Sequence, residues 1–170
     1  RAFLESAIYA AQRQAFGRRL DQLPMVQETL VNMVVQLEAV SSVVFETASL
    51  ASGAGDEAGR RLYRILVPLS KFRGARRGLE LASQAVEILG GNGYIENWPA
   101  ARQLRDAQCH TIWEGAENII CLDVLRAMAK ESAHDALLDR VDAALSAADH
   151  PLLGPVKDLV ARVRREAQEV

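Results

Sequence analysis

Residues 110 to 119, "HTIWEGAENI", place one carboxylate between a tryptophan and a glycine, just before an apolar run with helical spacing. Two interpretations of this carboxylate, Glu114, are open. In the first, it is an acidic residue in a first helical turn, where it interacts favourably with the helix macrodipole. In the second, it is a general base held at the edge of a helix, where it takes a proton from a bound molecule.

A glycine-rich stretch, "EILGGNGY" at residues 87 to 94, is the second candidate for chemistry. Glycine reaches positive φ without a side-chain penalty, so Gly90 and Gly91 can end a helix. The same two glycines can instead bring bare backbone amides close to a ligand. A helix C-cap and a ligand cradle both fit this stretch.

An arginine near the start of the chain, Arg13, is the third candidate. It lies in "QRQAFG", residues 12 to 17, one turn before the end of a helix that is expected to finish at Phe16 and Gly17. The guanidinium group is a planar fork of donors that suits a phosphate or a carboxylate. A solvated cation at a helix end is the alternative.

The elements that must position these residues are helices. Apolar residues recur at a spacing of three and four almost throughout, as in Leu30, Met33, Leu37, Val40 and Val44. Alternating strand patterns bounded by turn residues are absent from the sequence. With 170 residues, 49% of them hydrophobic, the chain is large enough to bury a core. We therefore predict an all-α fold, a four-helix up-and-down bundle with extra short helices at the C-terminal end.

Proline and glycine set the predicted helix boundaries. The first helix already runs at Arg1, Pro24 suits a first helical turn, and "SGAGDEAG" at 52–59 is a glycine-rich stop before the next helix. That helix is expected to reach about Leu89, with Pro68 removing one backbone hydrogen bond and bending it. The later predictions are an irregular segment at 90–99, a short helix from Pro99 to Cys109, a helix from Gly115 to about Lys130, and two short helices beyond.

Two regions follow from these boundaries, a helical bundle at residues 1–130 and a helical C-terminal extension at 131–170. The chain begins at Arg1, inside an amphipathic helix and without a start methionine or signal sequence. We therefore expect it to be a piece of a longer protein.

Composition excludes several classes of protein. Cys109 and Cys121 form no CxxC motif, and no histidine lies at ligand spacing from them, which argues against a disulfide framework and against a zinc or other metal site. No uninterrupted apolar run approaches the ~18 residues of a membrane-spanning helix. We expect a cytoplasmic protein with free thiols and no membrane partner.

The formal net charge is −2, but the segment from Arg60 to Arg77 holds six arginines, Lys71 and no acidic residue. At ~100° per helical residue, Arg60, Arg64 and Lys71 share one face, and the last three arginines lie on roughly the opposite side. The two halves form a single phosphate-binding stripe only if a bend at Pro68 realigns them. A solvated, salt-bridged helix face is the ordinary interpretation.

The order and spacing of all these motifs together resemble one known family. In chain order the pattern consists of R-x-x-F-G, a long helix, L-G-G-x-G-Y, W-P, R-D, and I-W-E-G leading into an apolar helix. This pattern resembles the C-terminal helical domain of the acyl-CoA dehydrogenase flavoproteins. The resemblance covers residues 1 to about 130. The segment "IWEGAENIICLDVLRAM" is most similar to the branch that includes the adaptive-response (AidB-like) flavoproteins.

The resemblance implies a role for each candidate. Glu114 aligns with the carboxylate that removes the α-proton of an acyl-CoA thioester while a hydride leaves the β-carbon for N5 of FAD, and Gly115 leaves room for the substrate. The implied cofactor contacts are Arg13, Phe16, Glu87, Gly90, Gly91, Ala116 and Asn118. The FAD site would be shared with a neighbouring subunit and with domains outside this chain, in a homodimer or homotetramer. An electron-transfer flavoprotein or a similar acceptor would take the electrons.

Three positions depart from the family pattern: Pro24 and Glu87 each stand where a glutamine is frequent, and Ala116 lacks the hydroxyl of the usual threonine. A carboxylate at position 87 would repel a pyrophosphate but could accept a hydrogen bond from an adenine amine.

The alternative function is that of an adaptive-response flavoprotein with a nucleic-acid-binding or protective role and little dehydrogenase turnover. The charge pattern does not favour a nucleic-acid partner. The helix from Met25 to about Leu50 carries apolar residues on more than one stripe, which predicts burial by more than one neighbour and self-association.

Overall fold

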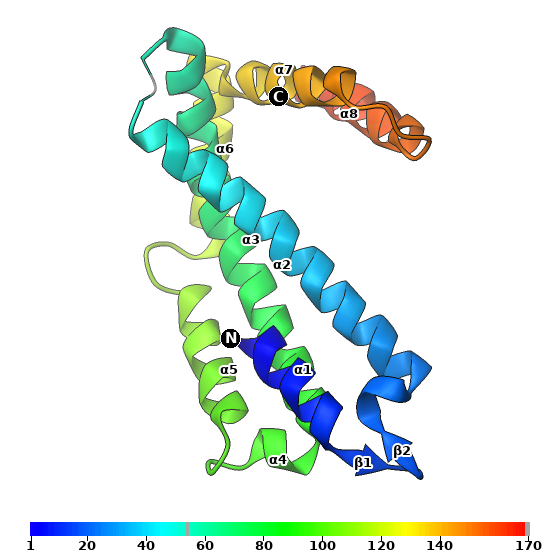
Figure 1. Cartoon of the computed structure of the whole chain (residues 1–170). Coiled ribbons are helices and arrows are strands. Elements are labelled where there is room, and N and C mark those ends of the chain that lie inside the picture. Colours follow the sequence, from blue (N-terminus) through cyan, green and yellow to red (C-terminus); the bar gives the residue numbers. More distant parts are fainter. Residues whose placement is uncertain (54, 169–170) are drawn as a thin grey trace. The chain divides into compact units, whose positions relative to one another are not determined.

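The computed structural model describes residues 1–53 and 55–168. In chain order these residues form α1 (Ala2–Gln12), β1 (Gln14–Ala15), β2 (Arg18–Arg19), the 3-10 helix η1 (Leu20–Gln22), α2 (Pro24–Ala51), α3 (Glu57–Leu89), α4 (Gly91–Tyr94), α5 (Pro99–His110), α6 (Glu117–Glu131), α7 (Ala133–Ala147) and α8 (Leu153–Ala167) (Figure 1). The predicted all-α class is confirmed. Within the predicted glycine-rich stop at 52–59, Ala54 lies outside the described residues.

Two short elements differ from the sequence prediction. β1 and β2 pair antiparallel, with Gln14 opposite Arg19, around a two-residue turn. Phe16 (φ 52°) and Gly17 (φ 78°) both adopt positive φ there, which is the backbone of a tight hairpin turn. The segment at 90–99, expected to be irregular, contains the one-turn helix α4. Each strand has two residues and α4 has four, which is only about one repeat of the corresponding hydrophobic pattern, so periodicity could not indicate them.

The chain forms two compact units, and both α2 and α3 contribute to each of them. Unit 1 consists of residues 1–44 and 71–117, and unit 2 consists of residues 45–70 with the chain from Asn118 onward. These units are not the regions 1–130 and 131–170 expected from the sequence. The division near residue 130 stays a prediction.

The core of unit 1 joins α1, α2 and α3. Met33 of α2 is fully buried against Leu81 and Ala85 of α3, and Ala2, Phe3, Leu30, Leu37 and Ile88 pack around them. α4 lies very close to α3, because a Cβ at Gly93 would stand 2.3 Å from the Val86 carbonyl oxygen. Only glycine permits this approach, which fixes the turn between α3 and α5.

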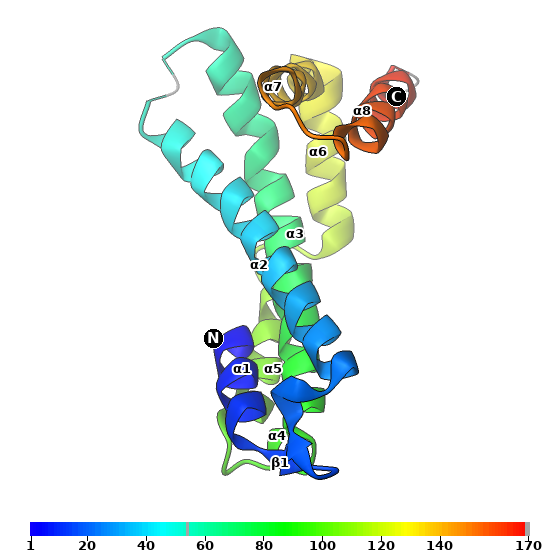
Figure 2. The same ribbon diagram turned by 45° about the vertical axis from the view of Figure 1, so that its right-hand side comes forward.

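The core of unit 2 joins the first half of α3 to α6 and α7. Ile65 of α3, Ala127 of α6 and Ala133 of α7 are buried together, and Leu69, Val124, Met128 and Leu137 pack against them. α3 continues through Pro68, as predicted. Helix α8 packs back on α7 (Figure 2), where Arg164 donates hydrogen bonds to Asp139 and Asp142.

Helix α2 is exceptionally apolar. By length and composition alone, it is the one helix of the described residues that could cross a membrane, and only 6% of its most apolar window is buried. The sequence predicted no membrane-spanning helix because no apolar run is long enough without interruption, and the apolar window of α2 is interrupted by charged residues. The mostly buried core helices of soluble proteins and signal sequences pass the same test, so length and composition alone do not assign α2 to a membrane.

Candidate active site

Glu114 lies in the short loop that joins α5 to α6, and its backbone conformation is unusual. Glu114 has φ 56° and Gly115 has φ 111°. A non-glycine residue with positive φ costs about 1–2 kcal/mol, and such outliers cluster at functional sites. At the start of the loop, the Ile112 and Trp113 amides both donate to the Cys109 carbonyl, at 3.0 and 3.1 Å. These bonds extend the last turn of α5 as far as Trp113, so Glu114 is the first residue beyond that turn.

The Glu114 side chain is 68% exposed in this chain. Lys71 of α3 is the cation next to it, with Nζ 4.0 Å from Glu114 Oε2. The same ammonium donates a 2.7 Å hydrogen bond to the His110 carbonyl oxygen. The His110 ring contacts the Trp113 ring, with centroids 5.7 Å apart. Glu114 is therefore held beside a cation and an aromatic pair.

The other end of the loop is also tied to α3. Arg76 donates two hydrogen bonds to the carboxylate of Glu117, the first residue of α6. Ala116, which lies between Gly115 and Glu117, is exposed. Both ends of the loop around Glu114 are thus fastened to one helix by side chains that lie five residues apart.

A pocket of about 320 Å³ lies between α1, the β1–β2 hairpin and the end of α3. Its lining includes Tyr9, Arg13, Gly90, Gly91 and Asn92. Asn92 Nδ2 donates to the Tyr9 hydroxyl at 3.1 Å, and the Tyr9 ring meets the Trp98 ring edge to face. The structure thus brings together two of the sequence motifs, R-x-x-F-G and L-G-G-x-G-Y.

This pocket has groups that suit a phosphate-bearing cofactor. Arg13 is exposed and forms no ion pair with any described residue, so its guanidinium is available to an anion. No heavy atom stands within 4 Å of where a Cβ would lie at Gly90 or Gly91, which leaves their backbone accessible.

The other predicted contacts lie outside this pocket. Phe16 is 92% exposed at the hairpin turn. Glu87 is exposed and does not line the pocket. Asn118 is exposed in unit 2, and Pro24 begins α2. Glu114, Gly115 and Ala116 lie beyond the far end of α5, whose 12 residues span ~18 Å at 1.5 Å per residue.

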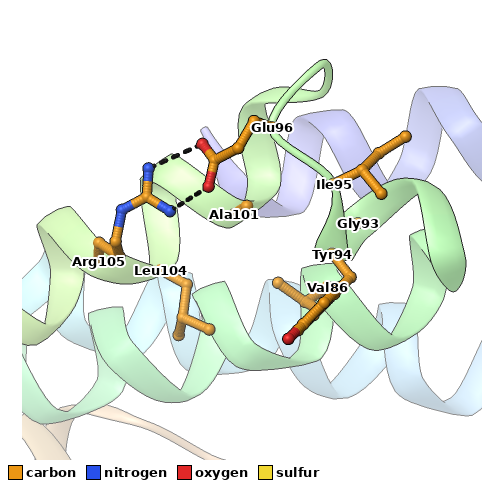
Figure 3. A pocket seen from close by; sticks show the side chains of 8 residues that line it. All are labelled: Val86, Gly93, Tyr94, Ile95, Glu96, Ala101, Leu104 and Arg105. Atoms are coloured by element: carbon orange, nitrogen blue, oxygen red, sulfur yellow. Dashed lines mark hydrogen bonds and ion pairs between the residues drawn. The ribbon is translucent and has the colours of Figure 1, made fainter.

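A second pocket, of about 510 Å³, lies between the end of α3, α4 and α5, and its walls include Val86, Ile95 and Leu104. Figure 3 shows Arg105 and Glu96 paired at its rim by two hydrogen bonds, of 2.7 and 2.9 Å. The Arg105 guanidinium lowers the pKa of the Glu96 carboxyl by hydrogen bonding and by its charge. The sequence reasoning did not identify this pocket.

Six of the seven cations of the basic run form ion pairs, and each of these pairs lies within one unit. Arg60 and Arg61 pair with Glu57, Arg64 with Asp123 and Glu131, Lys71 with Glu114, Arg76 with Glu117, and Arg77 with Glu80. Across residues 1–53 and 55–168, Arg73 alone of the seven has no ion pair. This is the salt-bridged helix face expected as the ordinary interpretation.

The described residues contain no group of three or more histidine, cysteine, aspartate or glutamate side chains that could hold a metal ion. Cys109 and Cys121 are exposed and free.

Sequence reasoning missed the residues that support the site. In the sequence, Lys71 and Arg76 stand out only as members of the basic run. No local pattern indicates that they contact the loop around Glu114. Tyr9 and Asn92 complete the pocket at Gly90, and Asn92 stands inside the L-G-G-x-G-Y motif without having been singled out.

Comparison with known proteins identifies the class. The model of the acyl-CoA dehydrogenase C-terminal domain matches residues 1–129. The chain therefore belongs to the acyl-CoA dehydrogenase family.

Individual relatives agree with this assignment. AidB of Escherichia coli strain K12 is 33% identical over 170 residues, which is 100% of this chain and 31% of AidB. The solved structure of Bd2924 in its apo form has a TM-score of 0.81 and 31% identity, over 99% of this chain and 35% of that one. The Caenorhabditis elegans protein ACDH-11, solved in complex with C11-CoA, has a TM-score of 0.81 and 29% identity, over 85% of this chain and 25% of that one. The chain thus spans about a third or less of the length of these relatives.

Proposed function

We propose that this chain is part of an FAD-dependent acyl-CoA dehydrogenase and that Glu114 is its catalytic base. The family is FAD-dependent. The observation that carries the proposal is the loop at Glu114: a carboxylate at positive φ, followed by a glycine and fastened to α3 at both ends.

Glu114 has the chemistry for removing the α-proton of an acyl thioester. An ionised carboxylate accepts a proton in one step, provided that it lies within hydrogen-bond reach of the carbon. Gly115 has no side chain to block the approach of the substrate. Because the side chain is 68% exposed in this chain, the water exclusion that such a base requires must come from the bound acyl-CoA and from parts of the protein outside this chain.

The pocket at Arg13, Gly90 and Gly91 is proposed to hold the pyrophosphate-bearing part of FAD, with Arg13 donating to phosphate oxygens and the glycine backbone approaching closely. When bound, the flavin supplies the acceptor for the hydride that leaves the β-carbon. Because Glu114 lies beyond the C-terminal end of α5 and is not part of the lining of this pocket, we propose that the two serve the flavins of two different subunits in a homodimer or homotetramer.

Phe16, Glu87, Ala116 and Asn118 stay predicted cofactor contacts. An electron-transfer flavoprotein or a similar acceptor, and a cytoplasmic location, stay predictions from the resemblance. The ion pairs of the basic run give no support to a nucleic-acid-binding role.

Absorption spectra of the full-length protein test the function. We expect the two visible bands of bound flavin, and we expect them to bleach anaerobically when butyryl-, octanoyl- or palmitoyl-CoA is added. A protein purified without flavin that takes up none from added FAD would contradict the proposal, as would bound flavin that all three thioesters leave oxidised.

A further inference from the structure

Lys71 makes a contact that its place in the basic run did not indicate. Its ammonium donates to the His110 carbonyl oxygen at 2.7 Å and stands 4.0 Å from Glu114 Oε2. The Lys71 side chain is 22% exposed, so most of it is packed against the protein. One half-buried cation thus lies beside both the last residue of α5 and the proposed base.

The carbonyl of His110 is one of the groups that a helix leaves without an internal partner at its C-terminal end. A cation there satisfies the carbonyl and interacts favourably with the negative end of the helix macrodipole. The Thr111, Ile112 and Trp113 amides all donate to carbonyls of Gln108 and Cys109, in the same last turn. Lys71 therefore fastens the turn from which the Glu114 loop departs.

Glu114 needs such a support because its own backbone is unfavourable. It adopts φ 56°, and a residue in that region persists only when its surroundings hold it there. Glu114 accepts no hydrogen bond from any described residue that would orient its carboxylate. The Lys71 ammonium, with Nζ 4.0 Å from Oε2, is the cation beside this carboxylate.

We propose that Lys71 is a positioning residue for the reaction: it holds the end of α5 and the Glu114 carboxylate in the geometry required for α-proton removal. This inference rests on the proposed function for its catalytic consequence. Its structural part, the tether between α3 and the Glu114 loop, stands independently.

The chain offers a matched control. Arg73 lies two residues further along α3, is exposed and forms no ion pair within the described part of the chain. Arg73→Met removes the same charge from the same helix without touching the loop. Lys71→Arg keeps a cation and its donors, and Lys71→Gln keeps a donor without the charge.

Amide hydrogen exchange of the full-length protein tests the tether without any substrate. In Lys71→Met, we expect the Thr111, Ile112 and Trp113 amides to exchange about tenfold faster, because a charge-assisted hydrogen bond is lost. Arg73→Met should match the wild type and Lys71→Arg should lie close to it. If Lys71→Met does not fold, Lys71→Gln takes its place. Unchanged exchange, or an equal effect of Arg73→Met, would overturn the inference.

Flavin reduction tests the catalytic consequence. At saturating concentrations of the thioester that reduces the wild type fastest, we expect Lys71→Met to slow reduction about 10- to 100-fold, since small misplacements of a reacting group have effects of that size. Its apparent Kd for the thioester should change less than about threefold, and Lys71→Arg should restore most of the rate. A Lys71→Met protein that reduces at the wild-type rate would refute the positioning role. A wild type that no thioester reduces would refute the proposed function, and the amide exchange would still decide the tether.

Discussion

At the scale of single residues, Gly93 decides how closely α4 can approach α3. A Cβ at this position would stand 2.3 Å from the Val86 carbonyl oxygen and 2.8 Å from the Val86 Cα. Both are backbone atoms of a helix, which cannot move aside as the end of a flexible side chain could. The position of the neighbouring Gly90 and Gly91 in the proposed cofactor pocket therefore depends on the absence of a side chain at Gly93.

We expect Gly93→Ala to lower the free energy of unfolding by about 1–3 kcal/mol or more, the usual cost of overpacking. Gly78→Ala is the control: Gly78 lies inside α3 with no atom within 4 Å of an added Cβ. That substitution should stabilise the chain by about 0.5–1 kcal/mol, because alanine favours helix. Urea unfolding measures both. Gly93→Ala with wild-type stability would show that α4 does not pack as described.

At the scale of elements, α3 and α6 are joined by a two-point contact as well as by the apolar core. Arg64 Nη1 and Nη2 donate to Asp123 at 3.0 and 2.7 Å. This hydrogen bonding lowers the pKa of Asp123. Since the folded state favours the ionised carboxylate, the stabilisation is fully present above the ordinary aspartate pKa and disappears as pH falls through the lowered pKa.

We expect Asp123→Asn to lower the free energy of unfolding by about 1 kcal/mol or less near pH 7, because both partners are partly solvated. At about pH 3, below the ordinary aspartate pKa, the difference from the wild type should be smaller, because the carboxyl is then largely protonated in the unfolded state and the folded state gains less by keeping it ionised. Asp158→Asn, in an exposed acid of α8 without an ion pair in the described range, should have little effect at either pH. An equal loss at both pH values would show that the contact is not electrostatic.

At the same scale, the long helices could be predicted from sequence, because α2, α3 and α6 repeat their apolar pattern over several turns. The hairpin at Phe16 and the helix at Gly91 could not, since each depends on a few backbone angles. Arg13, Gly90 and Gly91 were recognised as candidates from residue type. That they line one pocket depends on the packing of α1 against α3, and the tie from Lys71 to the Glu114 loop is a tertiary contact with no local pattern.

At the scale of the whole molecule, α2 has more apolar surface than the chain covers. Val31 and Val35 are 57% and 60% exposed, and Met25 is 75% exposed. Val31 and Val35 lie one turn apart on α2, so their exposed side chains adjoin on the helix surface, and adjoining exposed apolar side chains mark an interaction site. We expect the chain to self-associate through a symmetric helix-on-helix contact of α2.

Sedimentation velocity at micromolar concentration measures this association. Val35→Lys should shift the chain towards its monomer mass of 18.6 kDa, because a buried lysine without a partner is costly. Val156→Lys, on the exposed face of α8, should not. A wild-type chain that stays monomeric on concentration would mean that assembly requires other parts of the protein.

The central claim is that Glu114 removes the α-proton, and Glu114→Gln in the full-length protein tests it most directly. Glutamine has nearly the same shape but cannot accept the proton. We expect folding and flavin content to stay at wild-type levels, while exchange of deuterium from the α-carbon of octanoyl-CoA and reduction of the flavin both fall by about 10²–10⁴-fold, the usual cost of deleting a general base. A Glu114→Gln protein with full activity would contradict the account, because the base would then lie elsewhere and Glu114 would serve only the local structure of the α5–α6 loop.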